Sequence, residues 1–383
     1  MSCFADANLM YLLALCNSKV IYEALKMISP TINCQCGDVA KLPVIFPSDR
    51  SLQDRVESLA QACVELSRAD WDRFETSWDF RRHPLANGCR IAEAYEAWSA
   101  ECEERFARMK AHEEELNRLF LEIYGMQGDL SPEVRAEEVS VRRADRERDV
   151  KGLLSYAVGC MLGRYSTDRE GVVFAGGVWD ESLYESFRPD DDNVIPICCD
   201  DYFEDDILGR LIEWLQAVYG ADSLEENLSF IAESLGGKGG STAREVIRSY
   251  FLNGFYADHV KMYGKRPIYW LCDSGKKHGF KALLYVHRYR SDLLARIRTE
   301  YVHEQQGRYS SQLDFAESKL IQASGSERVR LNKQVKQLQD QMHEIRSYEE
   351  KMHHLADSNI ALSPDDGIVH NYALLSDILA KIK

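Results

Sequence analysis

The sequence has 383 residues, of which 45% are hydrophobic, so it is long enough for two or three domains with ordinary cores. Its formal net charge of −15 argues against nucleic-acid binding by the surface as a whole, because phosphate binding draws on clustered Lys and Arg. The longest apolar runs fall far short of a membrane span, and no signal peptide is recognised. We therefore expect a cytoplasmic protein with no membrane partner.

The eleven cysteines form no C-x-x-C pair and have no His at zinc spacing, which predicts reduced thiols rather than disulfides or a zinc site. No Ser or Cys is flanked by the motif of a nucleophile, and the histidines do not pair at the helical spacing of metal ligands. The sequence therefore predicts no catalytic residue and no metal ligand.

Charge is unevenly distributed along the chain. Residues 261–300 carry ten basic side chains against three acidic ones, whereas residues 180–206 carry eleven acids against Arg188 alone. Such polarity is typical of a protein that offers a basic surface to a polyanion while an acidic surface repels it or binds a basic partner. A solvated loop is the simpler interpretation of the acidic segment, which lacks the ligand spacing of an EF-hand.

The first fifty residues predict the end of a domain rather than a whole one. Residues 9–28 form an apolar helical stretch that Asn17 and Ser18 interrupt and Pro30 ends. Alternation within 39–46 predicts a short strand. Because a helix and a lone strand do not make a domain, we interpret this segment as a small α/β remnant.

Residues 51–150 predict a long helical hairpin. Apolar residues recur every three, four or seven positions from Ile91 to Ile123, which indicates an amphipathic helix. A turn signal at 83–88 joins this helix to an antiparallel partner at 52–75. The arginines between Arg135 and Arg148 alternate with acids, as on a salt-bridged helix surface.

Residues 151–300 predict a mostly helical domain, with helices at 204–219 and 241–262. The glycine cluster at 236–240 departs from a phosphate-binding loop and indicates a linker into the second helix, with Ser241 or Thr242 as N-cap.

Residues 301–383 predict a coiled-coil arm, because 328–355 carries an apolar heptad with Glu349 as its one polar core position, followed by a C-terminal helix after a turn at Pro364 and Gly367. The fold class expected from these elements is mainly α: a helical bundle and coiled-coil arms beside the α/β remnant.

The segment KRPIYWLCDSGKKHGFKALLYVHRYR, residues 265–290, is a basic and aromatic island in an acidic chain. Its apolar centre predicts that about half of it is core, with Trp270 and Tyr285 packed rather than stacked on bases. The lysines after Gly275 lie in a turn from which both ammonium groups can reach a phosphate backbone. The candidate contacts to double-stranded DNA are Arg164, Lys265, Arg266, Lys276, Lys277, Arg288 and Arg290.

This island resembles the C-terminal part of the PglX family, the adenine-specific DNA methyltransferases of type 1 bacteriophage-exclusion (BREX) systems. Further strings carry the resemblance over nearly the whole chain. They include SYAVGCMLGRYS (155–166), DNVIPICCDDYFEDDILGRLIEWL (192–215), LEENLSFIAESLGGKGGSTAREVIRSYFLNGFYADH (224–259) and DDGIVHNYALLSDILAKIK (365–383).

The resemblance implies the DNA-recognition and helical scaffold part of a site-specific adenine methyltransferase in phage defence, with residues 1–50 as the end of a truncated target-recognition domain. The intact enzyme would use S-adenosylmethionine. The family's Asn-Pro-Pro-Tyr motif needs adjacent prolines, which this sequence lacks, so this chain alone is expected to be inactive and to bind no cofactor. The implied partners are double-stranded DNA, a missing N-terminal methyltransferase domain or subunit, and other phage-defence proteins.

Two alternatives stay open. A free-standing specificity or scaffold subunit would join a separately encoded methyltransferase through the coiled-coil arms. A fused restriction-modification enzyme would carry similar recognition and helical parts, and its intact polypeptide would cleave DNA.

Overall fold

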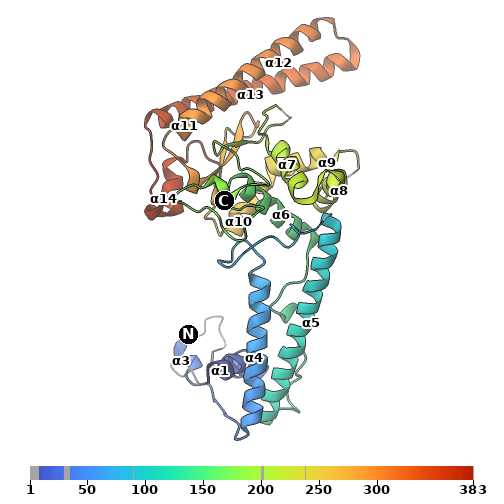
Figure 1. The fold of residues 1–383 in the computed structure, drawn as a ribbon, viewed down its shortest axis with the longest axis vertical. Coiled ribbons are helices and arrows are strands. Elements are labelled where there is room, and N and C mark those ends of the chain that lie inside the picture. Colours follow the sequence, from blue (N-terminus) through green and yellow to red (C-terminus); the bar gives the residue numbers. More distant parts are fainter. Residues whose placement is uncertain (1–7, 30–34, 89, 200–201, 238, 383) are drawn as a thin grey trace. The chain divides into compact units, whose positions relative to one another are not determined.

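The computed structural model describes residues 8–29, 35–88, 90–199, 202–237 and 239–382. Pro30, Asp200, Asp201 and Lys238, on which parts of the predictions fall, lie outside them. The chain divides into two compact units: Met1–Ser77 with Tyr95–Asp145, and Trp78–Ala94 with Arg146–Lys383. Helices dominate both units (Figure 1), which confirms the mainly α fold class. Within the described residues, no helix is long and apolar enough to span a membrane.

The first unit begins with three short helices, α1 (Leu9–Cys16), α2 (Lys19–Ile28) and α3 (Cys36–Val39). The Ser18 hydroxyl accepts the Ile21 N–H and caps the start of α2, which confirms the predicted interruption.

The strand predicted at 39–46 is wrong, because no strand forms there. Tyrosine hydroxyls bond the backbone of this segment where a neighbouring strand would otherwise do so. Tyr11 donates to the Ile45 carbonyl and Tyr124 to the Pro43 carbonyl, both at 2.6 Å. An alternating pattern could not reveal that these two phenols replace a partner strand.

The long helices α4 (Arg50–Trp71) and α5 (Ile91–Tyr124) are antiparallel, as predicted for the hairpin. Two ion pairs fix this direction, because the basic partner on α4 pairs late on α5 and the one just after α4 pairs early on α5. The pairs are Arg55 with Glu115 and Arg73 with Glu101, both at 3.0 Å. The core between α1, α2, α4 and α5 contains Tyr11, Leu15, Ile21, Val56, Ala60, Leu116 and Phe120.

Between Arg146 and Met262 the second unit contains five α-helices, and the first of them, α6 (Arg146–Met161), is buried along most of its length. The helix predicted at 241–262 is broken at Gly254, and Thr242 is confirmed as an N-cap, with the Glu245 side chain completing a capping box. The five helices are α6 (Arg146–Met161), α7 (Ile207–Tyr219), α8 (Leu224–Ser234), α9 (Ala243–Asn253) and α10 (Phe255–Met262).

One antiparallel sheet, in the order β1–β3–β2, lies in the second unit. Its strands are β1 (Ile195–Pro196), β2 (Tyr269–Asp273) and β3 (Lys281–Tyr285). Trp270 and Tyr285 are fully buried, which confirms that they pack in the core.

The chain then enters α11 (Leu293–Arg296), a π-helical turn (Ile297–Val302), and the paired helices α12 (His303–Gln322) and α13 (Gly325–Asp357), before α14 (Gly367–Leu374). Figure 1 shows α12 and α13 side by side, forming an arm that extends from the sheet region. Five of the predicted heptad residues are buried: Leu331, Leu338, Met342, Ile345 and Met352. Short 3-10 turns lie at Ala136–Glu138, Glu181–Leu183, Ala221–Ser223, Val286–Arg288 and Pro364–Asp366.

Candidate DNA-contact site

The β2–β3 hairpin separates most of the predicted DNA contacts into two groups. Because Tyr269 faces Tyr285, the start of β2 and the end of β3 lie together, and we call this the open end of the hairpin. The turn lies five strand residues away, a distance of about 16 Å. The open end carries Lys265, Arg266, Arg288 and Arg290, and the turn carries Lys276 and Lys277.

The two turn lysines differ in their surroundings. The Lys277 ammonium lies 2.6 Å from the Asp340 carboxylate on α13, and this hydrogen bond raises the pKa of Lys277. The Glu344 carboxylate accepts the backbone N–H groups of Lys277 and Gly279 and holds the turn against the arm. Lys276 is exposed and forms no ion pair with the described residues, so it is the turn cation that is free to meet a phosphate.

Arg164 and Arg288 are largely enclosed by the protein. Arg164 donates to the hydroxyls of Tyr165 at 3.0 Å and Tyr285 at 3.2 Å. Arg288 donates to two backbone carbonyls, and its guanidinium lies 4.3 Å from the centre of the Trp179 ring. Burial lowers the pKa of Arg288. Both guanidinium groups therefore have internal partners, whereas the side chains of Lys265, Arg266 and Arg290 are exposed and have no ion pair among the described residues.

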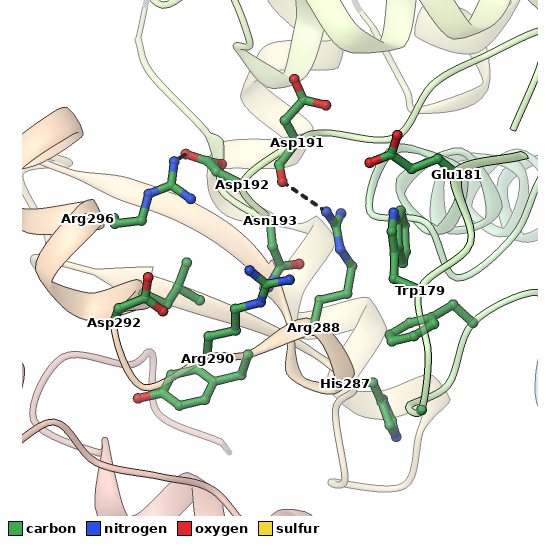
Figure 2. A pocket seen from close by; sticks show the side chains of 14 residues that line it. Trp179, Glu181, Asp191, Asp192, Asn193, His287, Arg288, Arg290, Asp292 and Arg296 are labelled. Atoms are coloured by element: carbon green, nitrogen blue, oxygen red, sulfur yellow. Dashed lines mark hydrogen bonds and ion pairs between the residues drawn. The ribbon is translucent and has the colours of Figure 1, made fainter.

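A pocket of about 480 Å³ opens beside the open end of the hairpin. Figure 2 shows the side chains of Arg288, Arg290 and Arg296 gathered around Asp192 and Asn193. Arg290 is exposed and forms no ion pair with the described residues. The pocket therefore offers one uncommitted guanidinium beside two that are already bonded.

Trp179 forms the aromatic wall of this pocket. Its ring stacks on Tyr184, with centroids 5.0 Å apart and planes at 16°. The Tyr184 hydroxyl donates to the Gly163 carbonyl at 2.6 Å. Trp179 is not among the residues predicted from the sequence, and its one local signal is an aromatic residue directly after Gly176-Gly177-Val178.

His259 fixes the start of β2 and thereby the open end of the hairpin. Its Nε2 accepts the backbone N–H groups of Ile268 at 3.2 Å and Tyr269 at 3.1 Å. Burial, with a smaller contribution from the charge of Arg164, lowers the pKa of His259 to about 3. The ring is therefore neutral at physiological pH and serves as a hydrogen-bond acceptor.

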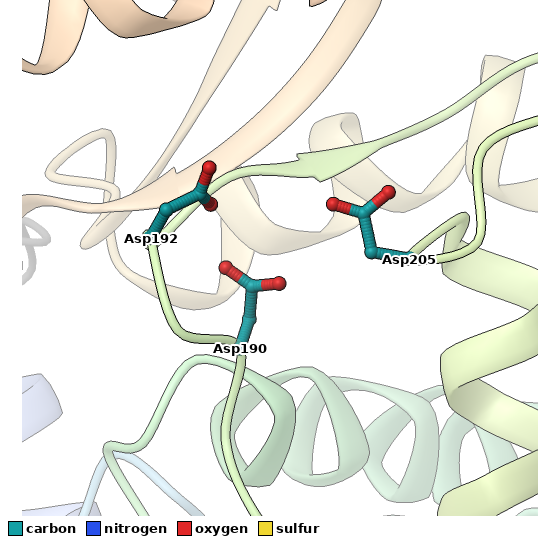
Figure 3. Close-up of side chains that lie close together, drawn as sticks. All are labelled: Asp190, Asp192 and Asp205. Atoms are coloured by element: carbon teal, nitrogen blue, oxygen red, sulfur yellow. The ribbon is translucent and has the colours of Figure 1, made fainter. Parts of the chain in front are cut away.

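Acidic side chains also reach the pocket, and three of them meet behind it. Figure 3 shows Asp190, Asp192 and Asp205, whose carboxylate oxygens lie within 4.8 Å of one another. Burial, followed by the hydrogen bond to Asp192, raises the pKa of Asp190 to about 8. The interpretation of the acidic segment as a solvated loop is wrong for these residues, because the chain folds them inward.

Carboxylates in this arrangement suit hard cations such as Mg²⁺ or Ca²⁺. Here they already accept hydrogen bonds from the protein. The Tyr301 hydroxyl donates to Asp205 at 2.6 Å and to Asp192 at 2.9 Å, and the Val194 N–H donates to Asp190 at 3.0 Å. The cluster is thus held together by internal donors. The absence of metal ligands in this chain remains a prediction.

No protein-family model matches the chain. It is 39% identical over 388 residues to the "Adenine-specific methyltransferase PglX" of Lacticaseibacillus casei (strain Zhang), a match that covers 97% of this chain and 32% of the relative. It is 36% identical over 406 residues to the "Adenine-specific methyltransferase BrxX" of Escherichia coli O9:H4 (strain HS), covering 99% of this chain and 33% of the relative. The chain spans about a third of the length of these curated relatives, and over nearly all of its own length it is a homologue of the adenine-specific methyltransferases PglX and BrxX.

Proposed function

We propose that this chain is the DNA-recognition and helical scaffold part of a site-specific, S-adenosylmethionine-dependent adenine methyltransferase in phage defence. The observation that carries the proposal is the 39% identity, over 97% of the chain, to a protein named as an adenine-specific methyltransferase. Because the chain spans about a third of that relative, catalysis and cofactor binding are assigned to the rest of the enzyme. The chain contributes contacts to double-stranded DNA.

We divide the chain into four proposed parts in sequence order. Residues 1–50 end a target-recognition domain, and 51–150 form a helical spacer. Residues 151–300 form the recognition domain, and 301–383 form the arm and C-terminal helix. The exposed cations at the open end of the hairpin support this assignment, since phosphate contacts from Lys and Arg position a protein on duplex DNA.

Arg290 is the residue whose replacement tests the proposal most directly. We expect the purified chain to bind duplex DNA, with a logarithmic affinity that falls linearly with the logarithm of salt concentration. Arg290→Gln should weaken binding and reduce the magnitude of that slope by about one, because one phosphate contact is lost. Fluorescence anisotropy over a series of salt concentrations measures both quantities.

The matched control is Arg68→Gln, which removes an exposed arginine from α4 in the other unit. It should leave affinity and slope unchanged. Failure of the wild-type chain to bind duplex DNA at low salt would contradict the proposal.

The division of labour between this chain and the rest of the enzyme is tested by calorimetric titration with S-adenosylmethionine. We expect no binding to the chain. Binding in the micromolar range would show that the cofactor site lies within these residues and would refute the division.

A further inference from the structure

We propose that the tip of the α12–α13 arm is a second surface that binds the phosphate backbone of duplex DNA. The tip, defined as residues 319–336, carries five basic side chains against the single acid Glu327 in a chain of net charge −15. This inference rests on the proposed function, because it takes duplex DNA as the partner. Its basic side chains are Lys319, Arg328, Arg330, Lys333 and Lys336.

The tip cations form no ion pair with the described residues, whereas half of the cations in the 261–300 window are bonded within the protein. Among the described residues, none of the five tip cations forms an ion pair, although the charge of Lys336, after the hydrogen bond from Lys277, helps to lower the pKa of Asp340 one turn away. In the 261–300 window, Arg298 lies 2.6 Å from Glu349, and Lys281 is buried and donates to the Leu252 carbonyl at 2.8 Å. Lys277, Arg288 and Arg296 also have the internal partners described above or ion pairs of their own.

The geometry of α13 places three of these cations in a row. Arg330, Lys333 and Lys336 are three residues apart, so each lies about 4.5 Å further along the helix axis than the one before. Lys333 and Lys336 occupy the face opposite the buried Leu331 and Leu338, which pack toward the core of the arm, and Arg330 lies at the edge of that exposed face. Packing on one side of α13 therefore directs the basic row toward solvent.

The base of the arm is anchored, so the tip is held at a fixed place in the second unit. Ile345, Tyr348 and Met352 of α13 pack in one buried cluster with Trp270 and Phe280 of the hairpin region. Residues 324–330 are all exposed, and Figure 1 shows this end of the arm extending away from the sheet. An anchored helix pair with cations at its far end can reach a stretch of phosphate backbone beyond the one met by the hairpin.

Duplex DNA fits this surface better than an acidic protein does. Phe315 is exposed, but the Lys319 ammonium lies 4.3 Å from the centre of its ring and partly covers it. Ile321 and Val329 are also exposed, on the two sides of the turn between α12 and α13. Five basic side chains against the single acid Glu327 favour a polyanion as the partner, because phosphate binding draws on clustered Lys and Arg.

The test compares the full chain with two double variants, each of which removes two exposed lysines. Lys333→Gln with Lys336→Gln changes the tip, and Lys351→Gln with Lys381→Gln is the charge-matched control. All four side chains are exposed, so circular dichroism should show unchanged folding. Duplex affinity is measured by anisotropy over a series of salt concentrations.

We expect the tip variant to reduce the magnitude of the salt slope by about two and to weaken binding at low salt by about tenfold or more, while the control matches the wild type. If the wild type binds DNA and both variants bind equally well, the tip is not a DNA surface, although the proposed function stands. If the wild type does not bind DNA, both proposals fall. A tip variant that keeps its DNA affinity but loses binding to polyglutamate would overturn the inference in favour of an acidic protein partner.

Discussion

Acidification should loosen the β2–β3 hairpin through His259. This ring is buried and accepts two backbone N–H groups at the start of β2, which it can do only while Nε2 carries no proton. Protonation would remove both hydrogen bonds and place a charge in the core. We expect His259→Gln, whose amide oxygen can accept but does not titrate, to remove this sensitivity to pH.

The magnitude follows from the pKa of His259, which burial lowers from 6.5 to about 3. The unfolded chain takes up a proton below pH 6.5 and the folded chain does not. The stabilisation from the neutral ring is therefore complete above pH 6.5 and is lost as pH falls toward 3. At pH 5 the loss extends over about 1.5 pH units at 1.36 kcal/mol each, or about 2 kcal/mol.

The assay is urea unfolding at pH 7 and pH 5, together with amide hydrogen exchange of the peptide covering 266–286. Asp190 titrates in the opposite direction, because its raised pKa removes stability as pH increases. The contribution of Asp190 is the same in the wild type and in His259→Gln, so it cancels when the two are compared. The wild type should lose about 2 kcal/mol more than His259→Gln between the two pH values, and equal losses would refute the reasoning.

Two further substitutions test the packing of the second unit. Arg248→Met removes the buried guanidinium that lies 3.0 Å from the Asp206 carboxylate. It should lower the free energy of unfolding, measured by urea titration, by about 3–5 kcal/mol. A loss below about 1 kcal/mol would mean that the Asp206 carboxylate finds another partner. Gly163→Ala should lower the free energy of unfolding by about 2–4 kcal/mol, because Gly163 has φ +79° and an added Cβ would lie 2.4 Å from the Trp179 ring. The displaced Trp179 ring should also shift the tryptophan fluorescence emission. An unchanged melting temperature would contradict that.

Local signals determined most of the helical fold. The cap at Ser18, the capping box at Thr242 and the apolar seam of α13 are each decided within a few residues, by side chains that meet the backbone or one another on the next turn. Such features are legible in a sequence because the interacting groups are neighbours in it. The resemblance to PglX, carried by long strings, was also available from the sequence and is confirmed by the relatives.

The strand predicted at 39–46 failed for the opposite reason. Its backbone is bonded by Tyr124, which lies far along the chain, and an alternating pattern carries no information about such a partner. The cluster of Asp190, Asp192 and Asp205 likewise depends on how a loop folds back on itself.

The basic residues mark the clearest boundary between what the sequence determined and what the tertiary structure decided. Sequence alone located a cationic window at 261–300 and gave Lys277 and Arg288 the same candidate role as Lys276 and Arg290. Folding pairs Arg298 with Glu349, which is 51 positions away, and Lys277 with Asp340, while Arg290 and the cations of the arm tip form no ion pair within the part of the chain that the structure describes. Charge along the chain is a property of composition, but free charge depends on which carboxylates the fold brings within a few ångströms, and only the tertiary structure determines that.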